Sequence, residues 1–550
     1  MAEIRSVRLM VGLEVHVELA TRTKMFSRAP NPAHHRFDGS PPNSLLDPTV
    51  LGLPGALPVM NRAAVEMAMM VGLALGCRIA ERTRWDRKSY YYPDLPKNYQ
   101  ISQYQLPLCF DGVVELSTGP DARARVGIVR AHLEEDAGKL LHEGPGGHAI
   151  DFSIVDLNRA GTPLLEIVTA PDFSSAQEVV AFAQQLRNIC RFLGVSEGVM
   201  QKGHMRFEPN INTVLTLDDG RQVRTPIVEI KNLNSFKALR GAIEFEEQDQ
   251  PARWRADRRE MGAGTKVTRG WDEGPAGSPG RTVVQREKED AHDYRYFPEP
   301  DLLPVEVSPA WVEEVRARVP ELPAARAARY AAEFALGAKE AAALVDERDV
   351  CRFYEQCVEA AAGSGVEPAR AGKACANLLL QSGARRANES GVLISELGIT
   401  PRQVAALVRL READRVTSTT ADELFGKLCD LAEAMRRAVA ADRELSGIPA
   451  RLYEAVARAE GLDPEEVRRR AENPEEADLV ARSMIVRDDG ALAGWIERAI
   501  AENPKVADDV RGGKLAAAGR LVGVVMKLSA GTADAKAVRA KVLGALGQKE

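Results

Sequence analysis

The chain has little cysteine and no long hydrophobic run. Its 7 cysteines are spread over 550 residues without a Cys-x-x-Cys pair, so the sequence indicates neither a disulfide framework nor a thiolate zinc site, and it favours a reducing cytoplasm. The longest apolar run, from Met67 to Cys77, has 11 residues, whereas a membrane-spanning helix needs about 20. Polar residues also interrupt the first apolar stretch, so we expect no secretory leader. We expect a cytoplasmic protein with no membrane segment.

Familiar nucleotide signatures are missing as well. The sequence contains no Gly-x-x-x-x-Gly-Lys-Ser/Thr loop and no Gly-x-Gly-x-x-Gly fingerprint, so any ATP site must be built in another way. A formal net charge of -6 repels phosphate, so any nucleic acid must be bound through a local basic face.

What the chain does contain is enough apolar sequence for several cores. With 45% hydrophobic and 28% charged residues, it has the composition of a soluble globular protein and the length of about three or four domains. Short β-like runs and helices mix up to roughly residue 295, and from Glu313 onward Ala, Arg, Glu and Leu recur at helical spacing. We predict an α+β domain over 1–297, a helical domain over 298–397 and a helical tail domain over 398–550.

Individual segments carry this prediction. Val7 to Leu19 alternates as a strand does, which would place Glu14, His16 and Glu18 on one face. Met261 to Arg281 is rich in Gly and Pro and is expected to be a connection. Further strands are expected at 126–130, 211–217 and 227–230, a helix at 175–193, and helix starts at Thr400 and Asp463, which each precede a proline.

Carboxylates recur near the ends of the expected strands. If they converge, they form an oxygen-rich cage of the kind that Mg²⁺ prefers, with phosphate oxygens and water completing it. The alternative is that each is an ordinary solvated or salt-bridged surface charge. The set comprises Glu14 with His16, then Glu134, Glu135 and Asp136, then Glu208, and then Glu229 followed by Lys231.

Seven blocks in roughly the first 300 residues closely resemble the B subunit of the aspartyl/glutamyl-tRNA amidotransferases, the GatB family. The C-terminal half matches that family more loosely, at 400–417 and 513–527. The seven blocks are Val11-Gly-Leu-Glu-Val-His-Val-Glu18, Leu53-Pro-Gly-Ala-Leu-Pro58, Tyr92-Pro-Asp-Leu-Pro-Lys-Asn-Tyr-Gln-Ile-Ser-Gln103, His132-Leu-Glu-Glu-Asp-Ala-Gly-Lys139, Asp156-Leu-Asn-Arg-Ala-Gly-Thr-Pro-Leu-Leu-Glu-Ile167, Glu229-Ile-Lys-Asn-Leu-Asn-Ser-Phe236 and His292-Asp-Tyr-Arg-Tyr-Phe-Pro-Glu-Pro-Asp301.

The resemblance implies a glutamine-synthetase-like cradle domain, a helical domain and a YqeY-like tail that meets tRNA. It also implies that ATP phosphorylates the side-chain carboxylate of Glu or Asp mischarged on tRNA(Gln) or tRNA(Asn), and that ammonia then displaces the phosphate. The chain shows neither a Ser-rich amidase signature nor a cysteine nucleophile elbow, so ammonia must come from elsewhere. The resemblance implies that an amidase-type A subunit supplies the ammonia and that a small C subunit joins the A and B subunits. The region from about 431 to 485 is longer than is usual in the family.

The resemblance also assigns residues. By likeness to the family's metal site, the candidate Mg²⁺ ligands are Glu14, His16, Glu134, Glu135, Glu208 and Glu229, and the first four are the candidate catalytic residues. Lys88 and Lys139 are the candidate groups for ATP phosphate, and Lys514, Arg520 and Lys527 are those for tRNA.

Two departures from the family pattern stand out. Arg206-Phe-Glu-Pro replaces a common Arg-Cys-Asp, which lengthens the reach of Glu208 by one methylene. The stretch 26–53 has no cysteine, so the thiolate zinc of many relatives is not expected, and His34, His35 and Asp47 are too loosely spaced to replace it.

Two other functions fit parts of the sequence. A scaffold could merely hold tRNA, because helix N-termini and cations near Gly512-Gly-Lys514 favour phosphate. A ligase could amidate a free small carboxylate, but roughly 250 helical residues would then have no use. The sequence does not decide whether Glu-tRNA(Gln), Asp-tRNA(Asn) or both are substrates.

Overall fold

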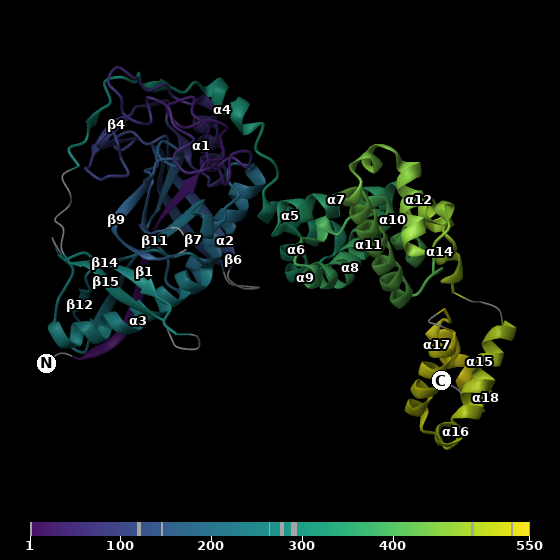
Figure 1. Ribbon diagram of the computed structural model, residues 1–550. Helices are drawn as coiled ribbons and strands as arrows, with labels where there is room; N and C mark the ends of the chain where they lie inside the picture. Colours follow the sequence, from purple (N-terminus) through teal and green to yellow (C-terminus); the bar gives the residue numbers. More distant parts are fainter. Residues whose placement is uncertain are drawn as a thin grey trace. The chain divides into compact units, whose positions relative to one another are not determined.

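The computed structural model describes residues 3–117, 123–144, 147–262, 265–275, 280–287, 294–485, 489–529 and 532–548 (Figure 1). The chain forms two compact units, Met1–Pro323 and Ala324–Glu550, which we call the sheet unit and the helical unit. Each is described by itself. No helix among the described residues is long and apolar enough to cross a membrane.

The sheet unit is built on a 13-stranded sheet with β1 (Ile4–Glu18) near its middle. Neighbouring strands run in the order β15-β14-β13-β11-β1-β10-β7-β5-β4-β16. The pairs are antiparallel except β13 with β14, which is parallel. The other strands of this sheet are β2 (Arg78–Ile79), β4 (Asp86–Ser89), β5 (Tyr99–Ser102), β6 (Cys109–Ser117), β7 (Arg123–Glu135), β10 (Pro163–Thr169), β11 (Met205–Leu217), β12 (Gln222–Arg224), β13 (Val228–Lys231), β14 (Val267–Asp272), β15 (Arg281–Glu287) and β16 (Phe297–Pro298).

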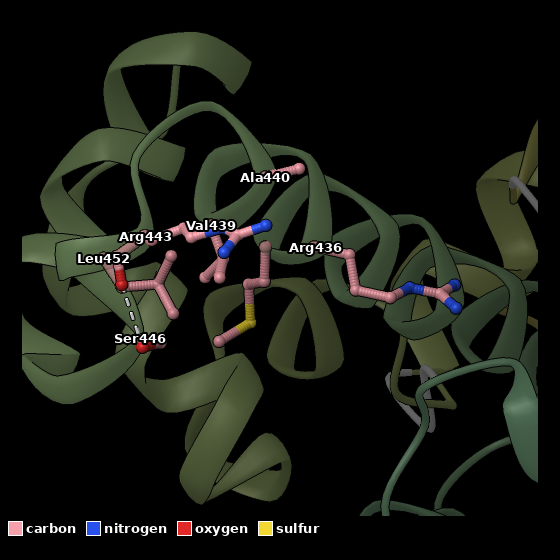
Figure 2. A pocket seen from close by; sticks show the side chains of 7 residues that line it. Arg436, Val439, Ala440, Arg443, Ser446 and Leu452 are labelled. Carbon is pink, nitrogen blue, oxygen red and sulfur yellow. Dashed lines mark hydrogen bonds between the residues drawn. The ribbon is translucent and has the colours of Figure 1, made fainter. Parts of the chain in front are cut away.

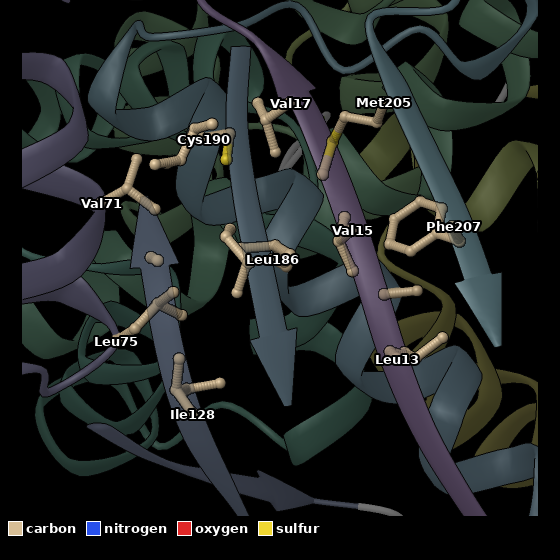
Figure 3. Close-up of a cluster of buried hydrophobic side chains, with 14 of the residues drawn as sticks. Leu13, Val15, Val17, Val71, Leu75, Ile128, Leu186, Cys190, Met205 and Phe207 are labelled. Carbon is tan, nitrogen blue, oxygen red and sulfur yellow. The ribbon is translucent and has the colours of Figure 1, made fainter. Parts of the chain in front are cut away.

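One face of this sheet is apolar and packs against helices. Because side chains alternate along a strand, Leu13, Val15 and Val17 point to one side of β1, where they are buried (Figure 3). They share a core with residues of the helices α1 (Arg62–Ala74), α2 (Ala176–Leu193) and α3 (Phe236–Asp257). Burying each such Val or Leu side chain contributes roughly 1.5–3 kcal/mol.

Side-chain caps start the three helices. The side chains of Asn61, Ser175 and Ser235 accept hydrogen bonds from backbone N–H groups in the first turns of α1, α2 and α3, which satisfies donors that the helix itself leaves unpaired. Two small strand pairs, β3 (Arg82–Thr83) with β17 (Val305–Glu306) and β8 (Lys139–Glu143) with β9 (Ala149–Asp156), and the helix α4 (Pro309–Arg316) complete the unit.

The helical unit contains only helices and turns among its described residues. Separate cores lie under α11, α12 and α13 and under the four helices from α15 to α18. The helices are α5 (Pro323–Phe334), α6 (Ala338–Val345), α7 (Arg348–Gly363), α8 (Pro368–Leu378), α9 (Ala384–Ser390), α10 (Pro401–Glu412), α11 (Ser418–Ala441), α12 (Pro449–Glu460), α13 (Pro464–Glu472), α14 (Asp478–Arg482), α15 (Asp489–Glu502), α16 (Pro504–Arg511), α17 (Ala518–Leu528) and α18 (Ala535–Ala545).

Most local predictions are confirmed. The expected strands correspond to β1, β7, β11 and β13 with ends that differ by up to a few residues, the expected helix is α2, and Thr400 and Asp463 cap α10 and α13. The connection expected from Met261 to Arg281 is wrong, because β14 runs through it and pairs with β13. The sheet unit extends to Pro323, since Val305 and Val315 join its core. The three-domain division stays a prediction.

Candidate active site

The face of the sheet opposite the helices carries charged side chains. Along β1 the alternation directs Glu14 and His16 to this side. Across the strand pairs, Glu14 lies opposite Glu208 of β11, and His16 lies opposite Glu166 of β10. Glu166 is in turn opposite His132 of β7. All five line one cavity of about 1230 Å³, so residues far apart in sequence meet in one place.

His16 lies at the centre of this cluster. Its Nε2 atom is 3.5 Å from Glu14 Oε1, 3.7 Å from Glu166 Oε2 and 4.0 Å from Glu134 Oε1. Two triads have ligand atoms within 4.8 Å of one another, one of Glu14, His16 and Glu208 and the other of His16, Glu134 and Glu166. Both are rich in the carboxylate oxygens that a divalent cation of the Mg²⁺ type prefers.

The pKa values in the cluster are strongly perturbed. Burial lowers the pKa of His16, but its contact with Glu166 and the charge of Glu208 outweigh this effect and raise the pKa to about 9. Burial raises the pKa of Glu14 to about 7, and Glu166 adds to that effect. Burial also acts to raise the pKa of Glu166, yet His132 and His16 hold it well below its usual range. Such divergent shifts among neighbouring groups are typical of catalytic sites.

Two lysines border the cluster at the β13–β14 side. Lys231 Nζ is 3.2 Å from Glu208 Oε2 and 4.0 Å from Glu229 Oε1. Lys266 Nζ is 3.4 Å from Glu229 Oε1, and the Thr268 hydroxyl donates a hydrogen bond of 3.1 Å to Glu229 Oε2. Glu229 is therefore fixed in the same cavity as Glu208.

Basic and aromatic groups border the other side. Lys88 Nζ is 3.9 Å from Glu134 Oε2 and lies 5.4 Å from the centre of the Tyr294 ring. Arg130 Nη2 is 3.7 Å from Glu166 Oε1. The predicted phosphate-binding Lys88 is thus in the cavity, beside carboxylates that attract it.

Glu135 does not join the others, and the expectation that it does needs correction. Adjacent residues of a strand point to opposite faces, so Glu135 points away from Glu134 and does not line the cavity. It forms an ion pair with Lys97, and its Oε1 atom accepts a hydrogen bond of 3.0 Å from the Ile101 N–H. Its place indicates a structural role.

Lys139 is also outside the cluster. It lies at the start of β8 with an exposed side chain and lines a separate cavity of about 640 Å³, so its position does not support a role beside Glu14. The three predicted tRNA-binding cations are in the helical unit. Lys514 is paired with Asp509 at 2.8 Å, and Arg520 and Lys527 are exposed on α17.

Several residues of the cavity were not singled out from the sequence. Glu166 is a lone carboxylate inside the apolar strand β10, a signal that the carboxylate search could have used. His132 and Arg130 alternate with Glu134 on β7, so the same period-two argument would have found them. Thr268 belongs to β14, which lies in the segment that the sequence predicts to be a connection. His292 and Asp293 of the last quoted block lie outside the described residues.

A pocket in the helical unit has a different character. It has a volume of about 530 Å³ and is lined mainly by apolar groups such as Met435, Val439 and Leu452 (Figure 2). The Arg436 side chain extends away from them and donates to the carbonyl of Glu396 at 2.9 Å. Its lining contains no carboxylate or imidazole.

A cluster of carboxylates around His16 and His132, bordered by cations, marks the sheet unit as the catalytic domain of an enzyme. Residues 9–313 match the family model of the GatB/GatE catalytic domain, and residues 356–546 match that of the GatB domain. The chain therefore belongs to the GatB family, as the seven sequence blocks predicted.

Curated relatives agree over nearly the whole length. The chain is 42% identical to the B subunit of the aspartyl/glutamyl-tRNA(Asn/Gln) amidotransferase of Thermomicrobium roseum, over 98% of both chains. It is 41% identical to the protein of the same name from Kineococcus radiotolerans, over 98% of this chain and 97% of the relative. With that of Rhodopirellula baltica it shares 38% identity over 95% and 93% of the two chains.

Proposed function

We propose that this chain is the B subunit of a tRNA-dependent amidotransferase and carries its ATP-dependent step. The substrate is Glu-tRNA(Gln), Asp-tRNA(Asn) or both, and the product is the corresponding amide. The observation that carries the proposal is the pair of carboxylate triads that share His16 in one cavity. It is joined by the names of the relatives, which are those of amidotransferase subunits.

The chemistry explains why such a site is needed. A carboxylate reacts poorly with ammonia because hydroxide is a poor leaving group. One oxygen of the substrate carboxylate therefore attacks the γ-phosphorus of ATP, and ADP leaves. Ammonia then adds to the carbonyl carbon of the acyl phosphate and loses a proton, and phosphate leaves with the shared oxygen. Each cycle consumes one ATP and one ammonia and yields ADP, phosphate and the amide.

The residues of the cavity fit a divalent cation. Glu14, Glu208, Glu134 and Glu166 offer oxygen ligands beside His16, and Mg²⁺ held there would neutralise the negative charge of the phosphates that opposes attack. Glu229 extends the acidic set across β13. Lys231 and Lys266 are placed to attract phosphate oxygens once ATP competes with the carboxylates that they now contact.

The fold and partners belong to the same proposal. The sheet unit is assigned a glutamine-synthetase-like fold, and the end of the helical unit a YqeY-like fold that meets tRNA. Because no amidase signature occurs in the chain, an amidase-type A subunit supplies ammonia and a small C subunit joins the two. The proposal includes no zinc ion.

The test uses the complex of the three subunits. With ATP, Mg²⁺ and glutamine, Glu-tRNA(Gln) or Asp-tRNA(Asn) should stimulate ADP release and be converted to the amide. Glu14→Gln should abolish both while leaving tRNA binding intact, whereas Glu306→Gln, which alters an exposed carboxylate paired with Arg82, should change neither. Full activity of Glu14→Gln would leave only the scaffold alternative, and an absence of tRNA-stimulated ADP release would reject the proposal.

A further inference from the structure

Arg130 lines the cavity, but the proposed function assigns no role to it. Its side chain lines the cavity from β7, on the same face as His132 and Glu134. Its Nε atom is buried and has no hydrogen-bond partner. The nearest carboxylate contact, from Nη2 to Glu166 Oε1, is 3.7 Å, which is longer than a hydrogen bond. A buried guanidinium N–H without an acceptor indicates that a ligand supplies one.

The guanidinium is nevertheless held in place. It lies 5.3 Å from the centre of the Tyr104 ring, and Tyr104 is stacked on Tyr296 with 4.1 Å between ring centres and 13° between ring planes. Such cation–π contact orients the plane of the guanidinium without using its N–H groups. The aromatic rings therefore position Arg130, which lines the cavity, without occupying its N–H donors.

Three other arginines line the cavity, Arg159, Arg206 and Arg295, and hydrogen bonds occupy the first two. Arg206 donates to Asp136 at 2.9 Å and to Glu18 at 3.4 Å. Arg159 donates to the carbonyl oxygens of Ala137 at 2.9 Å and Gly138 at 2.7 Å. Neither can accept a new anion without losing bonds that hold the protein together.

Arg130 lies apart from two of the three lysines that line the cavity, whereas Lys88 lies on its own side. Lys231 and Lys266 lie at the β13–β14 side, and the strands β11, β1 and β10, which carry Glu208, His16 and Glu166, lie between them and β7. The proposed reaction brings two anions to this cluster, a polyphosphate and a carboxylate. Lysine acts as a point charge that suits phosphate, whereas the planar guanidinium matches the two oxygens of a carboxylate.

We infer that Arg130 binds the side-chain carboxylate of the aminoacyl group carried by the tRNA, an inference that rests on the proposed function. Arg130 first holds both oxygens of that carboxylate. The oxygen that attacks the γ-phosphorus then leaves the guanidinium as ADP departs, while the other oxygen stays bound. In the acyl phosphate the held oxygen is the carbonyl oxygen. When ammonia adds, negative charge develops on this oxygen, and Arg130 stabilises it until phosphate leaves and the carbonyl re-forms.

The test measures separate constants for the two substrates in the three-subunit complex. Arg130→Gln should lower kcat/KM for Glu-tRNA(Gln) at least 100-fold and leave KM for ATP within twofold. Arg130→Lys keeps the charge but loses the planar fork, so it should retain part of the activity, with at least a tenfold loss. The matched control is Arg125→Gln, which alters an exposed arginine on the same strand and should change neither constant.

Binding of uncharged tRNA and the melting temperature of the complex should be the same in all variants, since a merely structural role would alter them. If Arg130→Gln does not fold, Arg130→Lys decides the question. A rise in KM for ATP with unchanged use of Glu-tRNA(Gln) would overturn the inference in favour of a phosphate site, and unchanged constants for both substrates would also overturn it. If the wild-type complex itself shows no tRNA-stimulated ADP release, the proposed function fails instead.

Discussion

The two units of this chain differ in how many charged side chains they bury. In the sheet unit, ionisable side chains are buried in number, among them Glu18, Lys24, Glu134, Glu166 and Glu246. In the helical unit, the charged side chain that is buried among the described residues is Glu466. Its carboxylate accepts hydrogen bonds from Arg470 at 2.7 Å and from backbone N–H groups at the start of α14.

This difference in the burial of charge indicates which unit carries the catalytic groups. Burying charge costs free energy unless each charge is paired and hydrogen-bonded. The incompletely paired carboxylates of the cavity therefore lower the stability of the sheet unit, and we attribute their presence to catalysis. The helical unit instead carries exposed ion pairs at helical spacing, such as Arg498 with Glu502, and such pairs add little to stability. We expect substitutions in the sheet unit to affect activity or folding strongly, and those in the helical unit to act through partners.

The largest effect is expected from two neighbouring glutamates with different roles. Glu134→Gln should lower tRNA-stimulated ADP release by roughly 10²- to 10³-fold without loss of stability, because it removes a carboxylate from the cavity. Glu135→Gln should instead lower the free energy of unfolding by roughly 3–5 kcal/mol, because it leaves the ammonium of Lys97 buried without its partner. Kinetics and denaturant titration of both variants check this.

The opposite result, lost stability in Glu134→Gln and lost activity in Glu135→Gln, would contradict the assignment of catalysis to one face of the sheet. If Glu135→Gln remained stable but inactive, the acidic site would extend to the helix-covered face, and Glu135 would return to the candidate ligands. Lys97→Met is the companion variant, and it should destabilise the sheet unit about as much as Glu135→Gln does.

A smaller effect is expected from the buried Lys24, whose Nζ donates to the carbonyl of Ala160 at 2.7 Å. Burial lowers its pKa to about 8, against the opposing effect of Asp47. Between pH 8 and 10.5 the unfolded chain holds this proton while the folded protein releases it, so stability rises with pH in that window. Relative to Lys24→Met, the wild type should gain up to roughly 3 kcal/mol.

Denaturant titrations at about pH 7.5 and about pH 10, which span most of this window, measure the increase in the free energy of unfolding. The control is Lys536→Met, which alters an exposed lysine of α18 in the helical unit and should show no such change with pH. A wild-type protein that keeps a constant difference from Lys24→Met across the window would show that Lys24 is ordinarily solvated.

The smallest effect is expected in the helical unit. Replacing Lys514, Arg520 and Lys527 by Ala should raise KM for the mischarged tRNA about tenfold and leave kcat and Tm unchanged, because exposed cations contribute through phosphate. The slope of log KM against log salt should fall in magnitude by roughly 0.7–0.9 for each phosphate that is no longer neutralised. Exposed Arg498→Ala is the control. An unchanged KM and salt slope would move the tRNA-binding surface elsewhere.

Sequence reasoning predicted the helices and strands more accurately than the residues of the candidate active site. Alternation along Val7–Leu19 predicted both the strand and the shared face of Glu14 and His16. The apolar face of 175–193 predicted α2, and the cap residues Thr400 and Asp463 located the starts of α10 and α13. It went wrong at Glu135, which the resemblance places among the metal ligands beside Glu134, although adjacent residues of a strand point to opposite faces. It missed β14 because flanking Gly and Pro outweighed a short alternating run whose partner, β13, is supplied by the fold.

The amino-acid order alone determined the family, the helices and strands, and the side of β1 that is charged, because caps, turns and the two-residue period act over a few neighbours. Only the folded sheet decided which charges meet. Pairing of β1 with β10 and β11 places His16 opposite Glu166 and Glu14 opposite Glu208. Such pairings depend on the register of distant strands, where a shift of one residue turns every side chain to the other face.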